Sequence, residues 1–294
     1  MHPYVLHNDQ IVSATEPVLR PGQLGLLSGW GVFTTFRIYD GVPFAFERHW
    51  RRLSRDAQLL HVPLAQNPEQ IRADLFRLID ANDAREAVLR LCIVRNEGSI
   101  WAGPGSGNPS DVIAMTNNLQ QWKDTARLSV ASNIRYTAFP FAGTKTLSWA
   151  HSLTLVETAR HEGFDEVILL NERGEATECT SANLFATKDG VTCTPPLSSG
   201  ASPGVTRATM LEELDLADTP VIEKALCVED LYQADEVFIT STSRELLPVE
   251  CIQNRVLAGA AGHWPVMTKL RQALRNYVQR YIEKQKRAAT ANSL

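Results

Sequence analysis

Gly174-Glu-Ala-Thr-Glu-Cys-Thr-Ser-Ala-Asn-Leu-Phe185 is the segment from which the fold of this chain is best predicted. Within it a carboxylate, Glu178, precedes a cluster of small polar residues. The apolar residues that follow predict a strand at Asn183–Ala186, and another strand is expected just upstream at Glu166–Leu170. The segment is therefore expected to lie between strands of a sheet, with an acidic side chain close to its polar cluster.

Helices and strands alternate on both sides of this segment. Helical periodicity is found at about Trp149–Glu162 and Val205–Leu214, and an amphipathic helix is expected at about Val266–Lys286. Further strands are predicted at Leu128–Ser132 and Glu236–Thr240. This interleaving predicts an α/β or α+β fold.

The first part of the chain shows the same mixture of elements. Pro63 ends a first helix and Pro68 suits the first position of a second one. Between two later strands, Asn96–Ser110 contains four glycines and two prolines and is expected to be a loop. The predicted elements are strands at Tyr4–His7, Ile11–Val12, Val32–Tyr39, Ala87–Arg95 and Asp111–Thr116, with helices beginning at Phe46 and Pro68.

Composition favours a two-domain protein with a small-molecule partner. The chain has 294 residues, 44% of them hydrophobic, and the pattern weakens near Asn117–Thr125. We therefore predict a domain at residues 1–117, a linker at 118–126 and a second domain at 127–294. A net charge of -4 with mixed signs gives no basic stripe for nucleic acid.

Cysteine spacing and hydropathy limit the class of protein further. The five cysteines are scattered without a Cys-x-x-Cys pair, so neither a disulfide framework nor a metal site is indicated. No apolar stretch approaches the roughly 20 residues that a membrane span needs. We expect a cytoplasmic protein that has no membrane partner and no metal.

Three kinds of residue suggest chemistry, although each has a plainer explanation when taken alone. Lys145 lies in a glycine-broken apolar stretch before a helix, where a lysine can form a Schiff base if its pKa is lowered, or can simply end a strand. Glu178 suits a cationic partner such as a protonated pyridine nitrogen, or is an ordinary turn carboxylate. Arg48, Thr206 after Gly204, and the hydroxyls that follow Thr240 suit a phosphate, or are caps and solvated side chains.

The order of these segments along the chain resembles that of class IV aminotransferases. These fold-type IV enzymes use pyridoxal 5'-phosphate (PLP) and include branched-chain aminotransferases, D-amino-acid transaminases and aminodeoxychorismate lyases. The resemblance covers nearly the whole chain and rests on six segments, namely Gly31–Arg37, Glu47–His49 with Arg51–Leu53, Lys145–Ser148, Thr177–Phe185, Pro203–Arg207 and Thr240–Val249.

The resemblance implies a fold, a cofactor and roles for individual residues. It implies a smaller N-terminal α/β domain, a larger C-terminal pseudo-barrel domain that binds PLP, and a homodimer. Lys145 would be the Schiff-base lysine, and Glu178 would pair with the pyridine nitrogen. The phosphate would be held by Arg48, Thr206, Thr242 and the backbone of Val205, and Ser181, Ala182 and Asn183 would lie beside the ring. Gly204 and Ser241 would be further cofactor-binding positions.

The implied reaction moves an amino group from an amino acid or amine to a 2-oxo acid, with ping-pong kinetics. Two alternatives stay open: a PLP-dependent 4-amino-4-deoxychorismate lyase that releases pyruvate, and a protein that keeps the fold but has lost activity. A transaminase consumes an acceptor keto acid and the lyase does not. Retention of both Lys145 and Glu178 speaks against the inactive protein.

The resemblance does not identify the substrate, because the chain departs from each subfamily. The loop after Arg95 lacks the Arg-x-His of D-amino-acid transaminases, and Val88-Leu-Arg90 keeps only the arginine of the branched-chain Tyr-x-Arg. Phe33-Thr-Thr35 resembles the lyases, and Ser241–Arg244 replaces a Gly-Thr-Ala-Ala segment. The candidate substrate residues are Phe33, Thr35, Arg37, Arg90, Ser243 and Arg244, and Arg95 and Arg135 are further arginines that suit a carboxylate.

Overall fold

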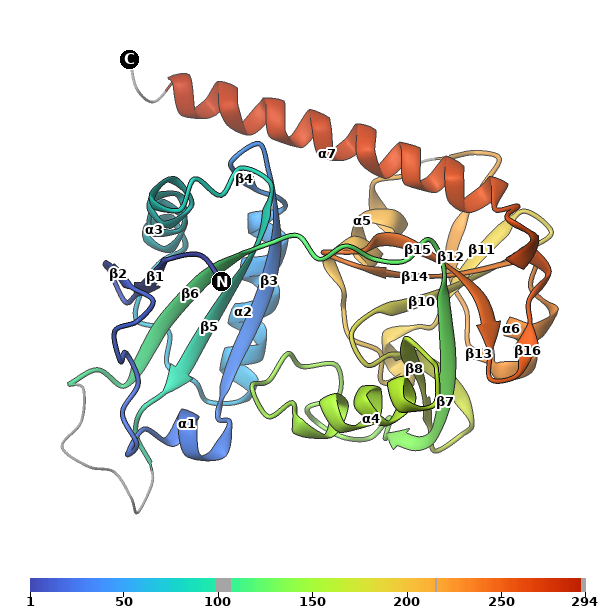
Figure 1. The fold of residues 1–294 in the computed structure, drawn as a ribbon, viewed down its shortest axis with the longest axis horizontal. Helices are drawn as coiled ribbons and strands as arrows, with labels where there is room; N and C mark the ends of the chain where they lie inside the picture. The colour runs from blue at the N-terminus through green and yellow to red at the C-terminus, as the bar shows by residue number, and fades with distance from the viewer. Residues whose placement is uncertain (99–106, 215, 292–294) are drawn as a thin grey trace. The chain divides into compact units, whose positions relative to one another are not determined.

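The computed structural model describes residues 1–98, 107–214 and 216–291. These form two compact units, each with its own sheet (Figure 1). The first, here called the N-terminal unit, comprises Met1–Gln120, Thr144–Trp149 and the chain from Arg280; the C-terminal unit comprises Gln121–Gly143 and Ala150–Gln279. The mixed α/β architecture expected from the sequence is confirmed. Residues 99–106 of the predicted Asn96–Ser110 loop lie outside the described residues.

The N-terminal unit is built on a six-stranded antiparallel sheet with strand order β2-β1-β6-β5-β3-β4. Helices α2 and α3 cover one face of this sheet (Figure 1). Asn67 caps α3 by accepting a hydrogen bond from the Gln70 N–H, and Pro68 takes the first helical position as predicted. The elements are β1 Tyr4–His7, β2 Gln10–Ser13, α1 Leu24–Ser28, β3 Gly31–Tyr39, β4 Val42–Pro43, α2 Phe46–Leu59, α3 Pro68–Ala81, β5 Ala87–Arg95 and β6 Ser110–Asn118.

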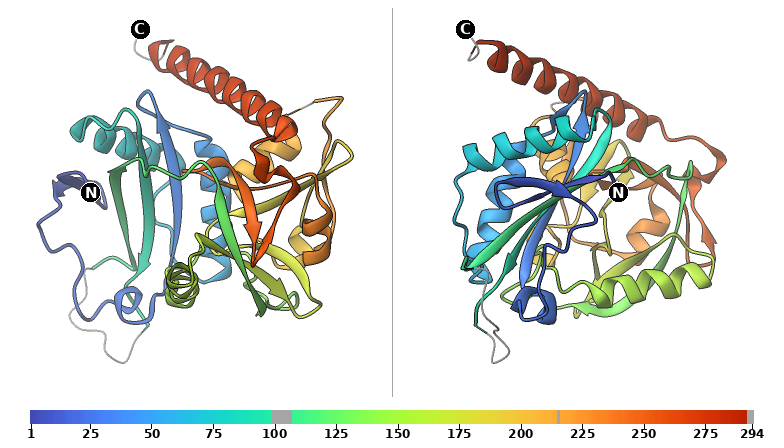
Figure 2. Two further views of the ribbon diagram at one scale, coloured as in Figure 1. Left: turned by 45° about the vertical axis from the view of Figure 1, so that its right-hand side comes forward. Right: turned by 60° about the vertical axis from the view of Figure 1, so that its left-hand side comes forward.

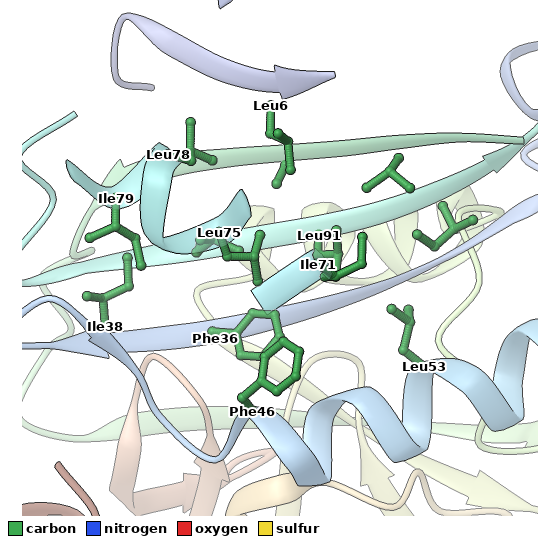
Figure 3. Packing of buried hydrophobic residues seen from close by; sticks show 14 of the residues in the cluster. Leu6, Phe36, Ile38, Phe46, Leu53, Ile71, Leu75, Leu78, Ile79 and Leu91 are labelled. Atoms are coloured by element: carbon green, nitrogen blue, oxygen red, sulfur yellow. The ribbon is translucent and has the colours of Figure 1, made fainter. Parts of the chain in front are cut away.

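Alternation along β3 separates the core of this unit from its other face. Val32, Phe36 and Ile38 are fully buried on the side of α2 and α3, where Figure 3 shows leucine and isoleucine side chains from both helices packed around Phe36. Phe33 and Thr35 point to the opposite face, because successive side chains of a strand alternate. Two of the candidate substrate residues thus share one face of the sheet.

Residues 144–149 pack on β3 although they are distant in sequence. Thr146 forms a bridge with Val32, the Lys145 carbonyl accepts the Phe33 N–H at 2.9 Å, and the Leu147 N–H donates to the Gly31 carbonyl at 3.0 Å. A Cβ on Gly31 would lie 2.5 Å from both the Ile93 carbonyl oxygen and the Leu147 side chain. Only glycine therefore allows Leu147 to approach the start of β3 this closely.

The C-terminal unit is a ten-stranded curled sheet with strand order β12-β11-β10-β14-β15-β7-β8-β9-β13, to which β16 adds beside β15 (Figure 2). Strands β7 and β8 are parallel, and α4 connects them. The elements are β7 Ala126–Arg135, α4 Ala150–His161, β8 Glu166–Asn171, β9 Glu175–Cys179, β10 Asn183–Lys188, β11 Val191–Thr194, η1 Leu197–Ser199, α5 Val205–Glu212, β12 Val221–Glu223, β13 Leu226–Cys227, α6 Val228–Gln233, β14 Glu236–Ser241, β15 Glu245–Ile252, β16 Arg255–Val256 and η2 Ala258–Ala261. Helix α7, Pro265–Ala291, begins in this unit, and its residues from Arg280 belong to the N-terminal unit.

Several strands of the C-terminal unit were not predicted from the sequence. Strand β9 looks polar, yet every residue from Ala176 to Cys179 is buried, because β9 pairs with β8 on one side and β13 on the other. Strand β15 contains Pro248, which lowers strand propensity, and its register with β7 shifts between Val249 and Cys251. Tertiary pairing overrides local preference in both strands.

Two helices differ from their predicted limits by one or two residues. Helix α5 ends at Glu212, two residues before the predicted Leu214, and α4 begins at Ala150. Within the part of the chain that the structure describes, no helix is both long and apolar enough to cross a bilayer.

His49 makes the stability of the N-terminal unit depend on pH. It is buried on α2, its Nδ1 lies 2.7 Å from the Thr34 hydroxyl, and its ring lies 4.4 Å from that of Phe36. Burial, reinforced by the charge of Arg52, lowers the pKa of His49 well below its ordinary value of 6.5. As the pH falls through about 6.5, His49 binds a proton in the unfolded chain but stays neutral in the folded chain. The contribution of neutral His49 to the free energy of unfolding is therefore present above pH 6.5 and is lost as the pH falls.

We expect wild type to lose more unfolding free energy than His49→Gln when the pH falls from 7 to 5, on the order of 1 kcal/mol. Urea unfolding at the two pH values measures the difference, with His161→Gln, at an exposed position on α4, as the matched control. Equal losses in wild type and His49→Gln would show that His49 does not carry this pH dependence.

Candidate functional site

Lys145 is fixed through its backbone in the N-terminal unit. Its N–H donates to Asp56 Oδ2 of α2 at 3.0 Å, and its carbonyl accepts the N–H of Phe33 in β3. The side chain is partly buried. A helix and a strand thus set the position of the lysine Cα.

Helix α2 presents Arg48 and His49 in succession. Arg48 is half-buried, and its N–H donates to the carbonyl of Ala45 at 3.1 Å. His49 and Arg52 both contact the hydroxyl of Thr34, since the Arg52 guanidinium donates to it at 2.8 Å. These bonds hold the buried face of α2 against β3.

The face of the N-terminal sheet opposite α2 and α3 brings four of the substrate candidates together. Arg90 lies opposite Thr35, donates to its hydroxyl at 3.4 Å, and holds its guanidinium 4.7 Å from the centre of the Phe33 ring. Arg37 pairs with Glu86 at 3.2 Å. Among the described residues no carboxylate pairs with Arg90, so its charge is the one on this face that an anionic ligand would neutralise.

Glu178 on β9 is 4% exposed and forms three hydrogen bonds in the C-terminal unit. Its Oε1 accepts from Arg135 Nη2 at 3.0 Å and from the Ser202 hydroxyl at 2.9 Å, while Oε2 accepts the Ser202 N–H at 3.0 Å. A carboxylate has about four acceptor positions. With the described residues filling three of them, Oε2 keeps one position for a further donor.

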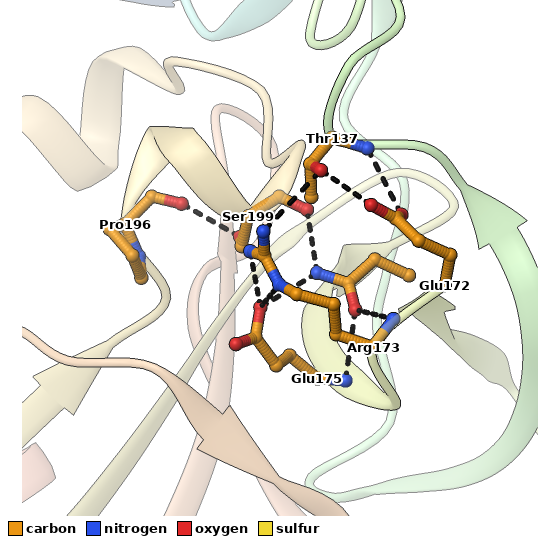
Figure 4. Close-up of polar contacts among 7 residues, drawn as sticks. Thr137, Glu172, Arg173, Glu175, Pro196 and Ser199 are labelled. Carbon is orange, nitrogen blue, oxygen red and sulfur yellow. Dashed lines mark hydrogen bonds and ion pairs between the residues drawn. The ribbon is translucent and has the colours of Figure 1, made fainter.

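A polar cluster lies at the turn between β8 and β9, the hairpin that carries Glu178 (Figure 4). Figure 4 shows Arg173 bound to Glu175, with Nη2 to Oε2 at 2.6 Å, and Glu172 bound to Thr137. Asn171, 1% exposed, donates to both Glu175 and the Ser199 carbonyl. The hairpin is thereby attached to the segment that leads to Ser202, which binds Glu178.

Asn183 and Gly204 bring the start of α5 against β10. Asn183 donates to the Ser202 carbonyl at 2.9 Å, and a Cβ on Gly204 would lie only 1.9 Å from Asn183 Oδ1. Gly204 is also the N-cap of α5, so the N–H groups of Val205 and Thr206 lie in the first turn, where no intrahelical acceptor is available. This arrangement suits an anion such as phosphate.

Ser181 belongs to a buried ionic cluster with Glu166 and Arg244. Glu166 Oε2 accepts from the Ser181 hydroxyl at 2.5 Å and from Arg244 Nη2 at 3.3 Å. The guanidinium also lies 3.9 Å from the centre of the Trp122 ring and contacts the Ser241 hydroxyl. Burial lowers the pKa of Arg244, against the opposing charge of Glu166.

The structure therefore groups most of the predicted residues within each unit. In the C-terminal unit, hydrogen bonds and close contacts link Glu178, Asn183 and Gly204 through Ser202. Ser181 and Ser241 meet at Arg244. Of the remaining positions, Ala182 is buried before β10, and Thr242 and Ser243 lie in the turn between β14 and β15.

Sequence reasoning missed several residues that hold this arrangement. Asp56 has a detectable signal, because it lies three residues after Leu53 on the apolar face of α2 where a charge is unexpected. Ser202 and Glu166 have none, since their role depends on a partner distant in sequence. Arg135, considered only as a possible carboxylate-binding residue, is bonded to Glu178.

Comparisons with known proteins agree with these features. Residues 31–252 match the family model "Amino-transferase class IV". A putative branched-chain-amino-acid aminotransferase of Methanocaldococcus jannaschii is 33% identical over 236 residues, 79% of this chain and 82% of that protein. D-alanine aminotransferase of Bacillus licheniformis is 28% identical over 279 residues, 93% and 96% of the two chains. These matches confirm the resemblance drawn from the six segments.

A solved structure extends the comparison to three dimensions. The branched-chain amino acid aminotransferase of Escherichia coli aligns with a TM-score of 0.85 at 28% identity, covering 95% of each chain.

The Glu166–Arg244 pair predicts a large cost for breaking a buried ion pair. The side chains are 1% and 6% exposed. Arg244→Met leaves the Glu166 charge buried without its partner and should lower the free energy of unfolding by about 3–5 kcal/mol. Chemical denaturation measures this change.

Arg275→Met is the matched control, because Arg275 pairs with Glu245 while 60% exposed. Its loss should cost below about 1 kcal/mol. Similar losses for both variants would contradict the prediction, whereas adding Glu166→Gln to Arg244→Met should recover part of the stability.

Proposed function

Because this chain belongs to the class IV aminotransferase family, we propose that it is a PLP-dependent aminotransferase that moves an amino group from an amino acid to a 2-oxo acid. The observation that carries the proposal is the family match over residues 31–252. That span includes every proposed cofactor residue from Arg48 to Thr242. The family depends on PLP, and relatives named as aminotransferases cover most of the chain.

The residues of this chain fit the proposed cofactor chemically. Glu178 is buried, is already held by Ser202 and Arg135, and keeps an acceptor position for a protonated ring nitrogen. Gly204 permits the close approach of the α5 N-terminus to Asn183. We assign the phosphate to the N–H groups of Val205 and Thr206 and to the Thr206 hydroxyl, with Arg48, Ser241 and Thr242 as further ligands and Ser181 to Asn183 beside the ring.

Each residue then has a definite task. When bound, PLP supplies the aldehyde that accepts the amino group and the ring that withdraws electrons from the substrate α-carbon. Glu178 stabilises positive charge at the ring nitrogen. The Lys145 amine, released when the donor binds, would remove the proton from the substrate α-carbon and deliver it to the former aldehyde carbon of the cofactor. Hydrolysis by one water would then release a 2-oxo acid, and a second 2-oxo acid would enter and reverse these steps, which gives ping-pong kinetics.

Arg90 is the arginine that we propose for the substrate carboxylate. The other candidates already have partners: Arg37 pairs with Glu86, Arg135 with Glu178 and Arg244 with Glu166. Arg95 donates to the carbonyl of Glu97 and stacks on Trp30. Phe33 and Thr35 lie beside Arg90 and would contact the rest of the donor.

Three further parts of the proposal rest on the sequence and on the family resemblance. We propose a homodimer, a cytoplasmic location, and a domain division at residues 118–126. The alternative of a 4-amino-4-deoxychorismate lyase is an outcome of the experiment below, since no residue contact favours it over transamination.

The visible absorption spectrum with added PLP tests the proposed function. Wild type should show a violet band that is absent in Lys145→Ala, and one of three donors (L-leucine, D-alanine or 1-phenylethylamine) should convert it to the shorter-wavelength aminated form. Turnover with that donor and a 2-oxo acid should fall by about 10²–10⁴-fold in Lys145→Ala, because the proton carrier is lost.

Lys188→Ala is the matched control, since Lys188 is an exposed lysine that pairs with Asp235. It should keep both the band and the turnover. A band that no donor converts, together with pyruvate release from aminodeoxychorismate, would favour the lyase. The absence of any band in wild type would rule out the proposed function.

Two threonines of α5 test the phosphate assignment. Thr206 lies in the first turn, whereas Thr209 is fully buried further along the same helix. Thr206→Val removes a hydrogen bond to a charged group, worth about 1.5–3 kcal/mol, and should weaken PLP binding roughly 10- to 150-fold. Equilibrium titration of the apo protein measures the Kd.

Thr209→Val, the control on the same helix, should leave the Kd unchanged. Equal Kd values for Thr206→Val and wild type would remove Thr206 from the phosphate site.

A further inference from the structure

Asp56 is a buried carboxylate to which the proposed mechanism gives no task. It lies on α2, is 0% exposed, and is separated from Lys145 by 89 positions in sequence. Its Oδ1 accepts two hydrogen bonds from Arg55, and its Oδ2 accepts the backbone N–H of Lys145 at 3.0 Å. The carboxylate of Asp56 is thus buried where it binds the backbone of Lys145.

The bond to Asp56 completes the attachment of the Lys145 backbone. Strand β3 binds the Lys145 carbonyl and, two residues later, the Leu147 N–H. The Lys145 N–H is bound by Asp56 of α2 and not by β3. Without Asp56, this N–H would lose its acceptor in a partly buried position. The lysine backbone would then be attached to β3 on one side only.

We propose that Asp56 is a positioning residue that holds the Lys145 backbone so that the lysine amine reaches the cofactor aldehyde; the inference rests on the proposed function. The Lys145 side chain is long and flexible, and the element that carries its Cα decides where the amine can go. Small displacements of a reacting group lower rates strongly, by on the order of 10²-fold for 1 Å.

The neighbouring ion pair with Arg55 serves mainly to make the buried charge tolerable. Arg55 is 42% exposed, so its attraction to Asp56 is screened by solvent. The position of Lys145 depends on the acceptor atom rather than on the charge. An amide at position 56 should therefore replace the carboxylate nearly as well at Lys145, because its one acceptor oxygen can take the Lys145 N–H while the Arg55 side chain, 42% exposed, turns to solvent.

Two measurements on Asp56→Ala, Asp56→Asn and wild type test the proposal. Hydrogen exchange of the apo protein reports on the Lys145 N–H without any cofactor. The second measurement is the rate at which the Lys145 amine and the aldehyde carbon of added PLP form a C=N bond with release of one water. The growth of the violet absorption band reports this rate. Asp74→Ala is the matched control, since Asp74 is a buried helix carboxylate that pairs with Arg77 instead.

In Asp56→Ala the Lys145 N–H should exchange on the order of tenfold faster or more, as expected for a lost hydrogen bond to a charged acceptor. Bond formation with PLP should slow by about 10- to 10²-fold. Asp56→Asn should stay within about fivefold of wild type in both measurements, because the acceptor is retained. Asp74→Ala should change stability but neither measurement.

The inference would be overturned if the Lys145 N–H of Asp56→Ala exchanged at the wild-type rate. It would also be overturned if this N–H exchanged faster while the rate of bond formation with PLP stayed unchanged. Equal effects of Asp56→Ala and Asp74→Ala would do the same, since they would show only general loss of stability. If wild type itself forms no bond with PLP, the proposed function fails, and the inference fails with it. The wild-type spectrum shows which of the two has failed before any variant is compared.

Discussion

Ser202 donates its backbone N–H and its hydroxyl to Glu178, and much of the candidate site in the C-terminal unit depends on these bonds. A buried carboxylate without partners is costly, so Glu178 is tolerated at 4% exposure only because Ser202 and Arg135 satisfy it. The same bonds hold the chain just before Gly204, where Asn183 fixes the start of α5 through the Ser202 carbonyl. The contacts of Ser202 therefore both satisfy the charge of Glu178 and fix the start of α5.

Asp56 shows the same principle in the N-terminal unit. It is a carboxylate on a regular element whose acceptor atom binds the backbone N–H of an irregular segment, here that of Lys145. Glu236 at the start of β14 also accepts two N–H groups, those of Val266 and Met267 at the start of α7. Loops carry unpaired N–H groups that must be satisfied when buried, and a carboxylate can satisfy more than one. In this protein, buried acids are used to fix loops and helix starts.

The sequence was sufficient to predict the helices with strong periodicity and most core strands, because their apolar spacing is a local property. Helices α2 and α3 and strands β3 and β5 fall close to the predicted limits. Strand β9 could not be predicted, since its polar residues are buried only by pairing with β8 and β13. Within the site, family resemblance marked Lys145 and Glu178. The partners Asp56, Ser202 and Glu166 act across long sequence separations, and no local pattern reveals them.

The arginines of this chain differ in their partners, because a sequence shows each charge but not whether it is already neutralised. Arg244 looked suited to a substrate, yet it is buried against Glu166 and Trp122, where moving it would leave a buried carboxylate unpaired. Arg90 is the opposite case. It lies on an exposed part of β5 beside Phe33, and the described residues offer it a hydroxyl and an aromatic ring but no carboxylate. A substrate carboxylate at Arg90 would gain a partner without breaking an existing ion pair, so electrostatic cost favours Arg90 over Arg244 for this role.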